Sequence, residues 1–415
     1  MVSLDPHFDS TSAAAASGRP AGSPLTRLAP PPAEGAPETA QLTLGFLPLT
    51  DAAPFIVAHR HGFFREFGLE VTLQRETSWT AQRNALNRGT THAAHLLFSM
   101  PVASACGLLG DRQPPLIVPW ILSRNGQAIT LNHRHLGKVA ADAKALRTAA
   151  IAGRDAGRPL VFGHTLRIGT HALWLRYWLA AGGINPDRDV ALITVPPPQM
   201  ADNMRIGRMD GFCVGEPWNA RALAEGLGFT AITSQEIWPD HPEKVCAFTE
   251  EFAARHPRTV IATLKALHLA GVWLDNPANH PAAAALLAEP AHLNCPAEWI
   301  LSRLGAAITY GDGRTLNHTH PLTFAQRGAS RPRPGHAVWM LTQLRRWGLH
   351  FGEPDYVGVS SRVVRPDFHA QALLELGVAE APSPAGPEVL FDGVPFDAAA
   401  PEAYVRQFEC KQLIG

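Results

Sequence analysis

The sequence predicts an α/β protein of two lobes with a ligand cleft between them. Segments with the spacing of strands alternate with segments that have the spacing of helices, which is typical of mostly parallel sheets. The alternation runs through 41–131 and again through 160–233, and the chain after about 244 is mostly helical in pattern. Two such units in tandem are expected to bind a ligand where the carboxyl ends of strands and the N-termini of helices converge.

The first α/β unit begins with a period-2 pattern. Leu42, Leu44 and Phe46 alternate with polar or small residues, as in a strand with one buried face. Ser78 is suited to cap the helix that follows it, because its hydroxyl can accept a backbone N–H. The predicted strands of this unit are 42–46, 69–73, 93–98, 116–122 and 128–131, and its predicted helices are 52–67, 79–87 and one after Pro101.

The second unit repeats this order of elements without repeating the sequence. Gly169 and Thr170 form a predicted turn into a helix that Gly182 ends. Later in the chain, Pro277 and Gly348 end two further helices. The predicted strands are 160–163, 190–195, 211–214 and 229–233, the predicted helices are 171–181, 200–207, 217–225, 259–274 and 336–347, and 380–400 is predicted to be loop.

The lobe boundaries are placed where this rhythm changes. Because the helical C-terminal part follows the second unit, the second lobe is expected to be inserted into the first. The expected organisation is a disordered tail over 1–40, rich in Ala, Ser, Pro and Gly, a first lobe over 41–130, a second lobe over 131–240, and a return to the first lobe with C-terminal helices over 241–415.

The start of the chain differs from an export signal. Asp5 and Asp9 precede the first basic side chain, Arg19, and the apolar run over 13–16 is too short. The five cysteines are scattered, odd in number and without a C-x-x-C pair, which argues against a disulfide framework and suits a reducing compartment. We therefore expect a cytoplasmic protein, and a misassigned start codon is the alternative.

The composition excludes several classes of function. The chain has 36 Lys and Arg against 36 Asp and Glu, so it lacks the positive charge with which proteins bind nucleic acid directly. No apolar run approaches the ~18 residues of a membrane span. The common motifs of nucleotide-binding, zinc-protease and serine-hydrolase sites are absent, so we expect neither an enzyme nor a cofactor or metal. The H-x-H pairs that begin at His133 and His318 are interpreted as loop histidines.

Five residues stand at predicted turns or helix starts beside strand ends: Trp79, Gln127, His171, Gly215 and Lys244. Four are side-chain donors and the glycine offers a backbone N–H, so together with one ammonium they would suit a small anion. Each also has a plain structural interpretation, such as packing for Trp79, a solvated imidazole for His171 and a surface charge for Lys244. Position alone leaves both interpretations open.

Seven segments carry a resemblance to a known family: LGFLPLTDAAP (44–54), GFFRE (62–66), SW (78–79), NGQAIT (125–130), LRYWLAAGGINP (175–186), MDGFCVGEPW (209–218) and HPEKV (241–245). They resemble, in order, the nitrate- and bicarbonate-binding proteins of ABC transporters, over 41 to about 375. The resemblance implies a two-lobed periplasmic-binding-protein type II fold. It also implies an anion site made of Trp79, Gln127, His171, the backbone of Val214, Gly215 and Glu216, and Lys244.

Within this family, Lys244 favours nitrate or nitrite as the ligand. In bicarbonate-binding relatives the corresponding position is acidic and calcium assists binding. Nitrate is planar and has no proton to donate, so it needs donors and positive charge around it. Bicarbonate carries a hydroxyl that needs an acceptor, which Glu216 could supply.

The absence of an export signal and of a lipidated cysteine makes the chain more similar to the cytoplasmic branch of the family, the NasS-type nitrate/nitrite sensors. The resemblance implies a sensor that holds an RNA-binding transcription antiterminator inactive and releases it when nitrate or nitrite binds, which controls nitrate-assimilation genes. One alternative is the substrate-binding component of an ABC transporter for nitrate, bicarbonate or sulfonate. The other is an enzyme on the same fold, like the fungal pyrimidine synthases, whose C-C-C-F-C motif is absent here.

Overall fold

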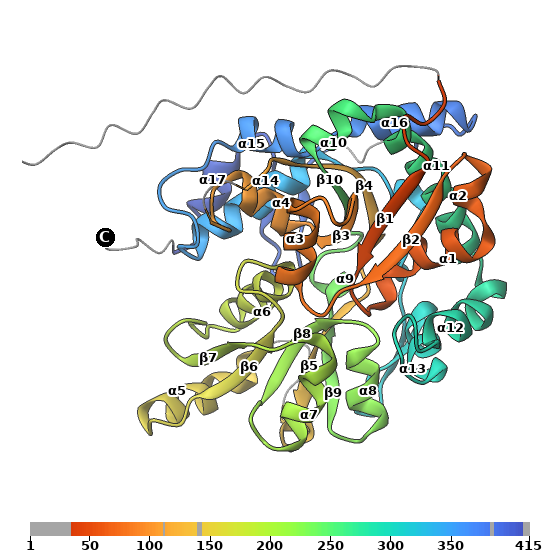
Figure 1. The fold of residues 1–415 in the computed structure, drawn as a ribbon. Coiled ribbons are helices and arrows are strands. Elements are labelled where there is room, and N and C mark those ends of the chain that lie inside the picture. Colours follow the sequence, from red (N-terminus) through yellow and green to blue (C-terminus); the bar gives the residue numbers. More distant parts are fainter. Residues whose placement is uncertain (1–34, 111–112, 139–142, 382–385, 410–415) are drawn as a thin grey trace, which may run out of the picture.

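Two five-stranded sheets, one in each lobe, organise the residues that the computed structural model describes, 35–110, 113–138, 143–381 and 386–409 (Figure 1). The first sheet has the order β2-β1-β3-β10-β4 and the second the order β7-β6-β8-β5-β9. The predicted two-lobed α/β architecture is therefore confirmed. The first sheet contains β1 (Gln41–Phe46), β2 (Glu70–Arg75), β3 (Ala93–Leu97), β4 (Leu116–Arg124) and β10 (Pro242–Thr249), and the second contains β5 (Gln127–Asn132), β6 (Leu160–His164), β7 (Val190–Thr194), β8 (Gly211–Gly215) and β9 (Gly228–Thr233).

The chain passes between the lobes twice, at neighbouring points. It leaves β4 through Asn125 and Gly126, whose φ angles of 64° and 80° are left-handed. A Cβ on Gly126 would also lie 2.7 Å from Cδ1 of Leu322, so both backbone and space require glycine there. The chain returns past Asp240, with φ of 56°, into β10. The N–H of Asn125 donates to the carbonyl of His241 at 3.2 Å, which joins the two crossings.

Strand β10 corrects the expectation that the sheets are parallel, and the described chain after it is mostly helical as predicted. Strand β10 runs antiparallel between β3 and β4, and β5 runs antiparallel to β8 and β9. The β1–β2, β1–β3, β6–β7 and β6–β8 pairs are parallel as predicted. Nearly every residue of β10 is buried, so the strand lacks the alternation by which a half-exposed strand is identified.

Helices cover both faces of the first sheet (Figure 1). Strand β4 contributes to both cores, because Ile117 and Trp120 pack in one and Val118 and Ile121 in the other. One face carries α1 (Ala53–His61), α2 (Phe63–Glu66), α10 (Glu250–Arg255), α11 (Pro257–Leu274) and α16 (Pro366–Glu375), and the other carries α3 (Trp79–Asn87), α4 (Ser99–Ala105), α14 (Pro334–Arg346), α15 (Tyr356–Val363) and α17 (Pro401–Val405).

The second sheet is covered in the same way, and one helix pair joins the lobes. The helices of the second lobe are α5 (Arg147–Asp155), α6 (Thr170–Ala181), α7 (Met200–Arg205), α8 (Trp218–Ala224) and α9 (Ser234–Ile237). Helix α13 (Ala297–Leu304) packs against α8 and against α12 (His280–Ala288), which contacts α1 of the first lobe. Two short hairpins complete the fold, β11 (Ala307–Thr309) with β12 (Thr315–Asn317), and β13 (Glu388–Val389) with β14 (Pro395–Phe396).

The predicted helix cap at Ser78 agrees with the structure, whereas one predicted helix is interrupted in the structure. Ser78 caps α3 as predicted, since its Oγ accepts the N–H of Ala81 at 3.1 Å. The helix predicted over 52–67 is broken at Gly62, whose φ of 80° separates α1 from α2. The stretch 380–400, predicted to be loop, contains the β13–β14 hairpin.

The expected disordered tail falls mainly on residues 1–34, which lie outside the described residues. Just after them, the carboxylate of Glu38 accepts the backbone N–H groups of Arg258 and Thr259, each at 2.8 Å, at the start of α11. These bonds attach the segment before β1 to the first lobe. Among the described residues, no helix is long and apolar enough to cross a membrane.

Candidate functional site

The predicted site residues come from both lobes and lie where the two sheets face each other. Trp79 is the first residue of α3 and Lys244 lies in β10, paired in register with Leu97 of β3. Across the cleft, Gln127 begins β5 and His171 is the second residue of α6. All four predicted side chains are buried, so the lobes are closed over them.

Lys244 is the centre of a buried ionic cluster. Its Nζ lies 2.8 Å from Oδ2 of Asp51 and 3.1 Å from Oε1 of Glu243, and its side chain is 0% exposed. The same Nζ lies 5.7 Å from the ring centroid of Trp79, which places the ammonium over an aromatic face. The other oxygen of Asp51, Oδ1, lies 2.8 Å from Nε2 of His95. The ammonium of Lys244 is buried from solvent and is held by the carboxylates of Asp51 and Glu243 and by the indole of Trp79.

A chain of hydrogen bonds connects the second lobe to this cluster. Thr165 Oγ1 lies 2.6 Å from Nδ1 of His171, and His171 Nε2 lies 2.7 Å from Oε1 of Gln127. Because the amide oxygen of Gln127 can only accept, Nε2 carries the proton and Nδ1 accepts from the threonine hydroxyl. The amide nitrogen of Gln127 then donates to Oδ2 of Asp51 at 3.2 Å. The imidazole therefore fixes the orientation of the glutamine amide.

Backbone and indole bonds hold the two lobes together at the cleft. The N–H of Thr50, at the start of the short 3-10 helix after β1, donates to the carbonyl of Glu216 at 2.8 Å. The indole N–H of Trp218 donates to the carbonyl of Pro48 at 3.1 Å. In the second lobe, Trp174 of α6 donates its N–H to Oε2 of Glu243 at 3.1 Å. The closed arrangement is thus stabilised by specific bonds as well as by apolar contact.

The cluster shifts the pKa of each of its ionisable groups in a direction that favours the ion pairs. Burial would raise the pKa of Asp51, but the Lys244 ammonium and His95 outweigh it and hold that pKa well below its ordinary value. Burial would lower the pKa of Lys244, but Asp51 and Glu243 outweigh it and raise that pKa. The pKa of Glu243 is lowered, because Lys244 overcomes the effect of burial.

The histidines around the cluster are neutral at pH 7. Burial, together with Lys244, lowers the pKa of His171 to about 3. Burial also lowers the pKa of His95, against the opposing effect of Asp51, and that of His241 to about 4. The ionised groups are then one ammonium and two carboxylates. An incoming anion therefore gains from Lys244 but must also overcome the charges of Asp51 and Glu243.

Unsatisfied polar atoms concentrate at this cluster. Buried polar groups are paired in the great majority of cases, so unpaired ones need an explanation. Lys244 lies opposite Ser123 in the sheet, and the Ser123 hydroxyl is buried without a hydrogen-bond partner among the described residues. The other atoms of this kind at or next to the cluster are Thr50 Oγ1, Trp79 Nε1, Ser99 Oγ and His241 Nε2. The indole N–H and the hydroxyls can donate to a ligand, whereas Nε2 of His241 is an acceptor, because Nδ1 of this neutral imidazole donates to the carbonyl of Pro242 at 3.2 Å.

The turn after β8 presents its backbone, and not its carboxylate, to the cleft. The side chain of Glu216 lies 3.3 Å from Nε of Arg303, measured from Oε1, and its Oε2 accepts the N–H of Ala220 in α8 at 3.1 Å. Glu216 is therefore engaged away from the cleft. The carbonyl of Val214 accepts from Asn219 at 2.8 Å. Gly215 is the residue of this turn that lies against Gln127 and Asp51.

Gly215 leaves no room for a side chain. An added Cβ would lie 2.8 Å from Oε1 of Gln127, 3.2 Å from Cδ2 of Leu49 and 3.4 Å from Oδ2 of Asp51. The backbone of the second lobe can approach the first lobe this closely only because the residue is glycine. This contact explains the position of Gly215 between the two lobes.

Sequence reasoning missed Asp51, His95 and Glu243, which complete the cluster. Asp51 lies within one of the segments that carry the family resemblance, and Glu243 is the neighbour of Lys244. His95 lies in a strand that is otherwise apolar, and a histidine in such a strand can indicate a buried side chain with a polar partner. Trp174 of α6 also donates to Glu243 and so belongs to the site.

The histidine pairs outside the cleft have local partners. His135 lies 2.8 Å from Asp210, and His320 lies 2.8 Å from Asp240. His318 Nε2 lies 2.9 Å from the hydroxyl of Tyr310. Within the described ranges, no group of three or more His, Cys, Asp or Glu side chains is arranged to hold a metal ion.

Comparison with known proteins gives consistent relatives. The NMT1-like family matches residues 35–288. The nitrate/nitrite binding protein NrtA of Nostoc is 38% identical over 387 residues, which is 91% of this chain and 87% of that protein. The bicarbonate transport ATP-binding protein CmpC of Synechococcus elongatus is also 38% identical, over 381 residues, 89% of this chain and 55% of that protein.

A solved structure supports the fold. The periplasmic nitrate-binding protein NrtA from Synechocystis superposes with a TM-score of 0.86 at 33% identity, covering 90% of this chain and all of that chain. The periplasmic-binding-protein type II fold implied by the resemblance is confirmed.

These matches correct the function expected from the sequence. The expectation of a cytoplasmic sensor that holds an antiterminator is wrong, since the relatives are named as nitrate/nitrite binding proteins and as transport components. The alternative, a transporter substrate-binding component, is the one they favour. The sensor expectation rests on the first residues of the chain, whereas the fold superposes on that of a periplasmic nitrate-binding protein. The cytoplasmic location stays a prediction.

Proposed function

Because the chain belongs to the NMT1-like family and to its nitrate- and bicarbonate-binding proteins of ABC transporters, we propose that it is the substrate-binding component of an ABC transporter for nitrate or nitrite. The observation that carries the proposal is the buried ammonium of Lys244, near which several donors have no hydrogen-bond partner among the described residues. A small anion that supplied acceptors to these donors would explain why they are buried. Closed lobes would enclose it completely.

Sequence identity alone does not select the anion, because the nitrate- and bicarbonate-named relatives are equally similar at 38%. The chemistry of the site favours nitrate or nitrite. Bicarbonate needs an acceptor for its hydroxyl, and Glu216, the acceptor considered from the sequence, is engaged by Arg303 and α8. Asp51 and Glu243 already accept bonds on both oxygens of each carboxylate. An anion that only accepts hydrogen bonds suits this set better.

Lobe closure provides the link to transport. Thr50 and Pro48 of the first lobe bond to Glu216 and Trp218 of the second, so the ligand can leave only when these bonds open. An anion that bonds to both lobes stabilises the closed form by its differential affinity for that form. A transporter that binds the closed protein could thereby distinguish the loaded from the empty state.

The test is calorimetric titration of the full chain with nitrate, nitrite, and bicarbonate with and without calcium. We expect saturable binding of nitrate or nitrite and none of bicarbonate. Lys244→Met should weaken that binding by at least about tenfold, the loss of about one charged hydrogen bond. Lys138→Met, at an exposed lysine of the second lobe, is the matched control and should bind as the parent does.

Two results would overturn the proposal. Binding of bicarbonate in preference to nitrate would mean that the carboxylates of the cluster, and not Lys244, select the anion. Equal binding of nitrate by the Lys244→Met variant would place the site elsewhere. The transport step is tested separately, by the uptake of isotopically labelled nitrate into cells with and without the gene, where equal uptake would reject it.

A further inference from the structure

A second polar cavity lies in the second lobe, apart from the cleft. It has a volume of about 210 Å³ and lies between α6 and the edge strand β7, on the helix-covered face of the sheet. His164 at the end of β6, Arg167 in the following loop and Arg176 of α6 contribute its basic side chains. Thr194, the last residue of β7, also lines the cavity. This volume is below the ~300 Å³ of the smallest drug-sized pockets, so the cavity suits a small ion.

The basic side chains of this cavity are buried but incompletely paired. Arg176 is 4% exposed, and its Nη1 donates to Oδ1 of Asp187 at 2.6 Å. Its Nε is buried and has no hydrogen-bond partner in the described part of the chain. His164 is 3% exposed, and its Nδ1 is equally without a partner there. Two residues that line the same small space therefore each carry an unsatisfied nitrogen that can donate.

The charge of the cavity favours an anion. Arg167 and Arg176 contribute two positive charges against the single carboxylate of Asp187. Burial and then the two guanidinium groups lower the pKa of His164 to about 4, so the imidazole is neutral and can donate from one nitrogen. Guanidinium groups match the geometry of oxyanions, which accept several hydrogen bonds at once.

We propose that this cavity is a second anion site, which binds a small inorganic oxyanion of the sulfate type. Arg176 and His164 would satisfy their unpaired nitrogens on the oxyanion, and Arg167 at the rim would add charge. The site is distinct from the cleft. Thr165, the residue after His164, bonds to His171 of the cleft, but none of the residues that line the cavity belongs to the cleft site.

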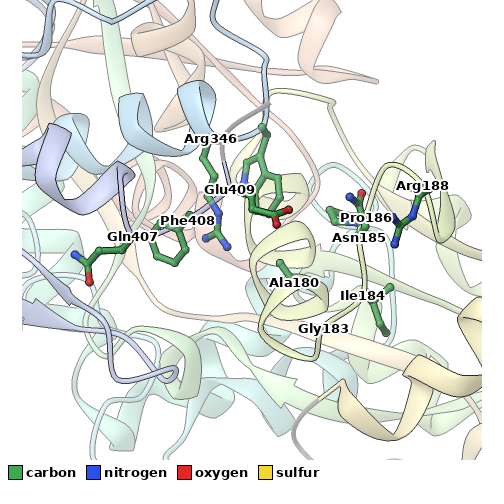
Figure 2. A pocket seen from close by; sticks show the side chains of 11 residues that line it. Ala180, Gly183, Ile184, Asn185, Pro186, Arg188, Arg346, Gln407, Phe408 and Glu409 are labelled. Carbon is green, nitrogen blue, oxygen red and sulfur yellow. The ribbon is translucent and has the colours of Figure 1, made fainter. Parts of the chain in front are cut away.

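A neighbouring larger cavity is less suited to an oxyanion (Figure 2). It measures about 530 Å³ and also touches Pro186, with α6 and its following loop on one side and the residues after α17 on the other. Its buried cation, Arg346, lies over aromatic rings, 3.7 Å from the ring centroid of Phe408 and 4.4 Å from that of Trp347. Glu409 adds a negative charge. The smaller cavity is therefore the better candidate for an oxyanion site.

The probe is sodium sulfate, titrated calorimetrically into the full chain in a chloride buffer without nitrate. Calorimetry is preferred to thermal shift, because sulfate stabilises many proteins without binding a site. We expect saturable binding with one sulfate per chain. Arg167→Met should weaken it at least about tenfold. Because Arg167 is exposed, its replacement leaves the fold intact, and Arg208→Met, at another exposed arginine of the same lobe, should bind as the parent does.

A second variant separates this site from the cleft. Lys244→Met should retain sulfate binding, since Lys244 lies in the other lobe and does not line the cavity. Loss of sulfate binding in Lys244→Met would place sulfate in the cleft and overturn the inference, as would the absence of saturable binding or equal binding by Arg167→Met. Sulfate binding without nitrate binding would reject the proposed function and leave this inference standing, and the reverse result would do the opposite.

Discussion

The ammonium of Lys244 lies 2.8 Å from Oδ2 of Asp51 in a site closed to solvent. Asp51 accepts hydrogen bonds from Lys244, from the amide of Gln127 and from His95. Two of these three donors are residues that the family resemblance assigns to the anion. In this closed structure the carboxylate of Asp51 therefore competes for the donors that an anionic ligand would use.

Asp51→Asn should tighten nitrate binding, because it removes one negative charge beside the ligand and releases part of the hydrogen-bonding capacity of Lys244. We expect an affinity increase of about tenfold, equivalent to ~1.4 kcal/mol. Calorimetric titration at one ionic strength would measure it, with Glu251→Gln on the surface as the matched control. Weaker binding in Asp51→Asn would show instead that Asp51 positions Lys244 for the ligand.

Trp79→Phe should weaken nitrate binding with little effect on the melting temperature. The substitution keeps an aromatic face near the ammonium of Lys244 but removes the indole N–H, which is buried and without a partner among the described residues. Losing one hydrogen bond to an anion costs ~1.5–3 kcal/mol. A large fall in melting temperature without a change in affinity would identify Trp79 as a core residue only.

Gly215→Ala should impair lobe closure. The new Cβ would lie 2.8 Å from Oε1 of Gln127, closer than real Cβ contacts, so the amide of Gln127 would have to leave its hydrogen bonds to His171 and Asp51. We expect nitrate affinity to fall at least about tenfold. Small-angle scattering should show a larger radius of gyration. Gly305→Ala has open space around its Cβ and serves as the control. Unchanged affinity in Gly215→Ala would mean that the closed contact is not needed for binding.

The fold could largely be predicted because the local sequence signals in each α/β unit agree with the helices and strands that the unit forms. Ser78 caps its helix through its own hydroxyl, and the strands with one exposed face alternate visibly, as at Leu42 and Leu44. Strand β10 was not predicted, because its position depends on a crossing back from the second lobe and its residues are buried on both faces. Such a strand has no local signal beyond being short and apolar.

The site was predictable only in part. The family resemblance named Trp79, Gln127, His171 and Lys244, which the structure brings to one cleft. For Glu216 the resemblance assigned only the backbone, whose carbonyl accepts from Thr50, and the carboxylate turns to Arg303 in α13. The partners of Lys244 were not predicted, since the contact with Asp51 joins residues far apart in the sequence. A charge alone in the sequence gives no indication of whether a counter-ion lies beside it in the fold.

Glu216→Gln tests this assignment of the turn. Because the carboxylate binds Arg303 and the N–H of Ala220, its loss should lower the stability of the second lobe against α13. Nitrate affinity should stay within about threefold of the parent, less than ~0.7 kcal/mol, since only the backbone of Glu216 reaches the cleft. A loss of affinity at unchanged melting temperature would show that the carboxylate acts on the ligand.

Stability should fall as the pH drops below about 6.5, the pKa of an unfolded histidine. The pKa of His171 in the folded protein is lowered to about 3 and that of His241 to about 4, in both cases mainly by burial. Between these values and about 6.5 the unfolded chain binds more protons than the folded one, so the free energy of unfolding decreases with falling pH. Asp51 adds to the loss only at still lower pH, because its pKa in the folded protein is strongly lowered.

Each buried histidine should contribute up to ~1.4 kcal/mol per pH unit below about 6.5. Urea unfolding at pH 7.5, 6.5 and 5.5 would measure the slope. His171→Gln, which retains a hydrogen-bonding side chain, should reduce the slope by one proton. An equal slope in the parent and in His171→Gln would mean that His171 is protonated in the folded protein. The imidazolium would then add a positive charge beside Lys244, and the cleft would attract an anion more strongly than it does with a neutral imidazole.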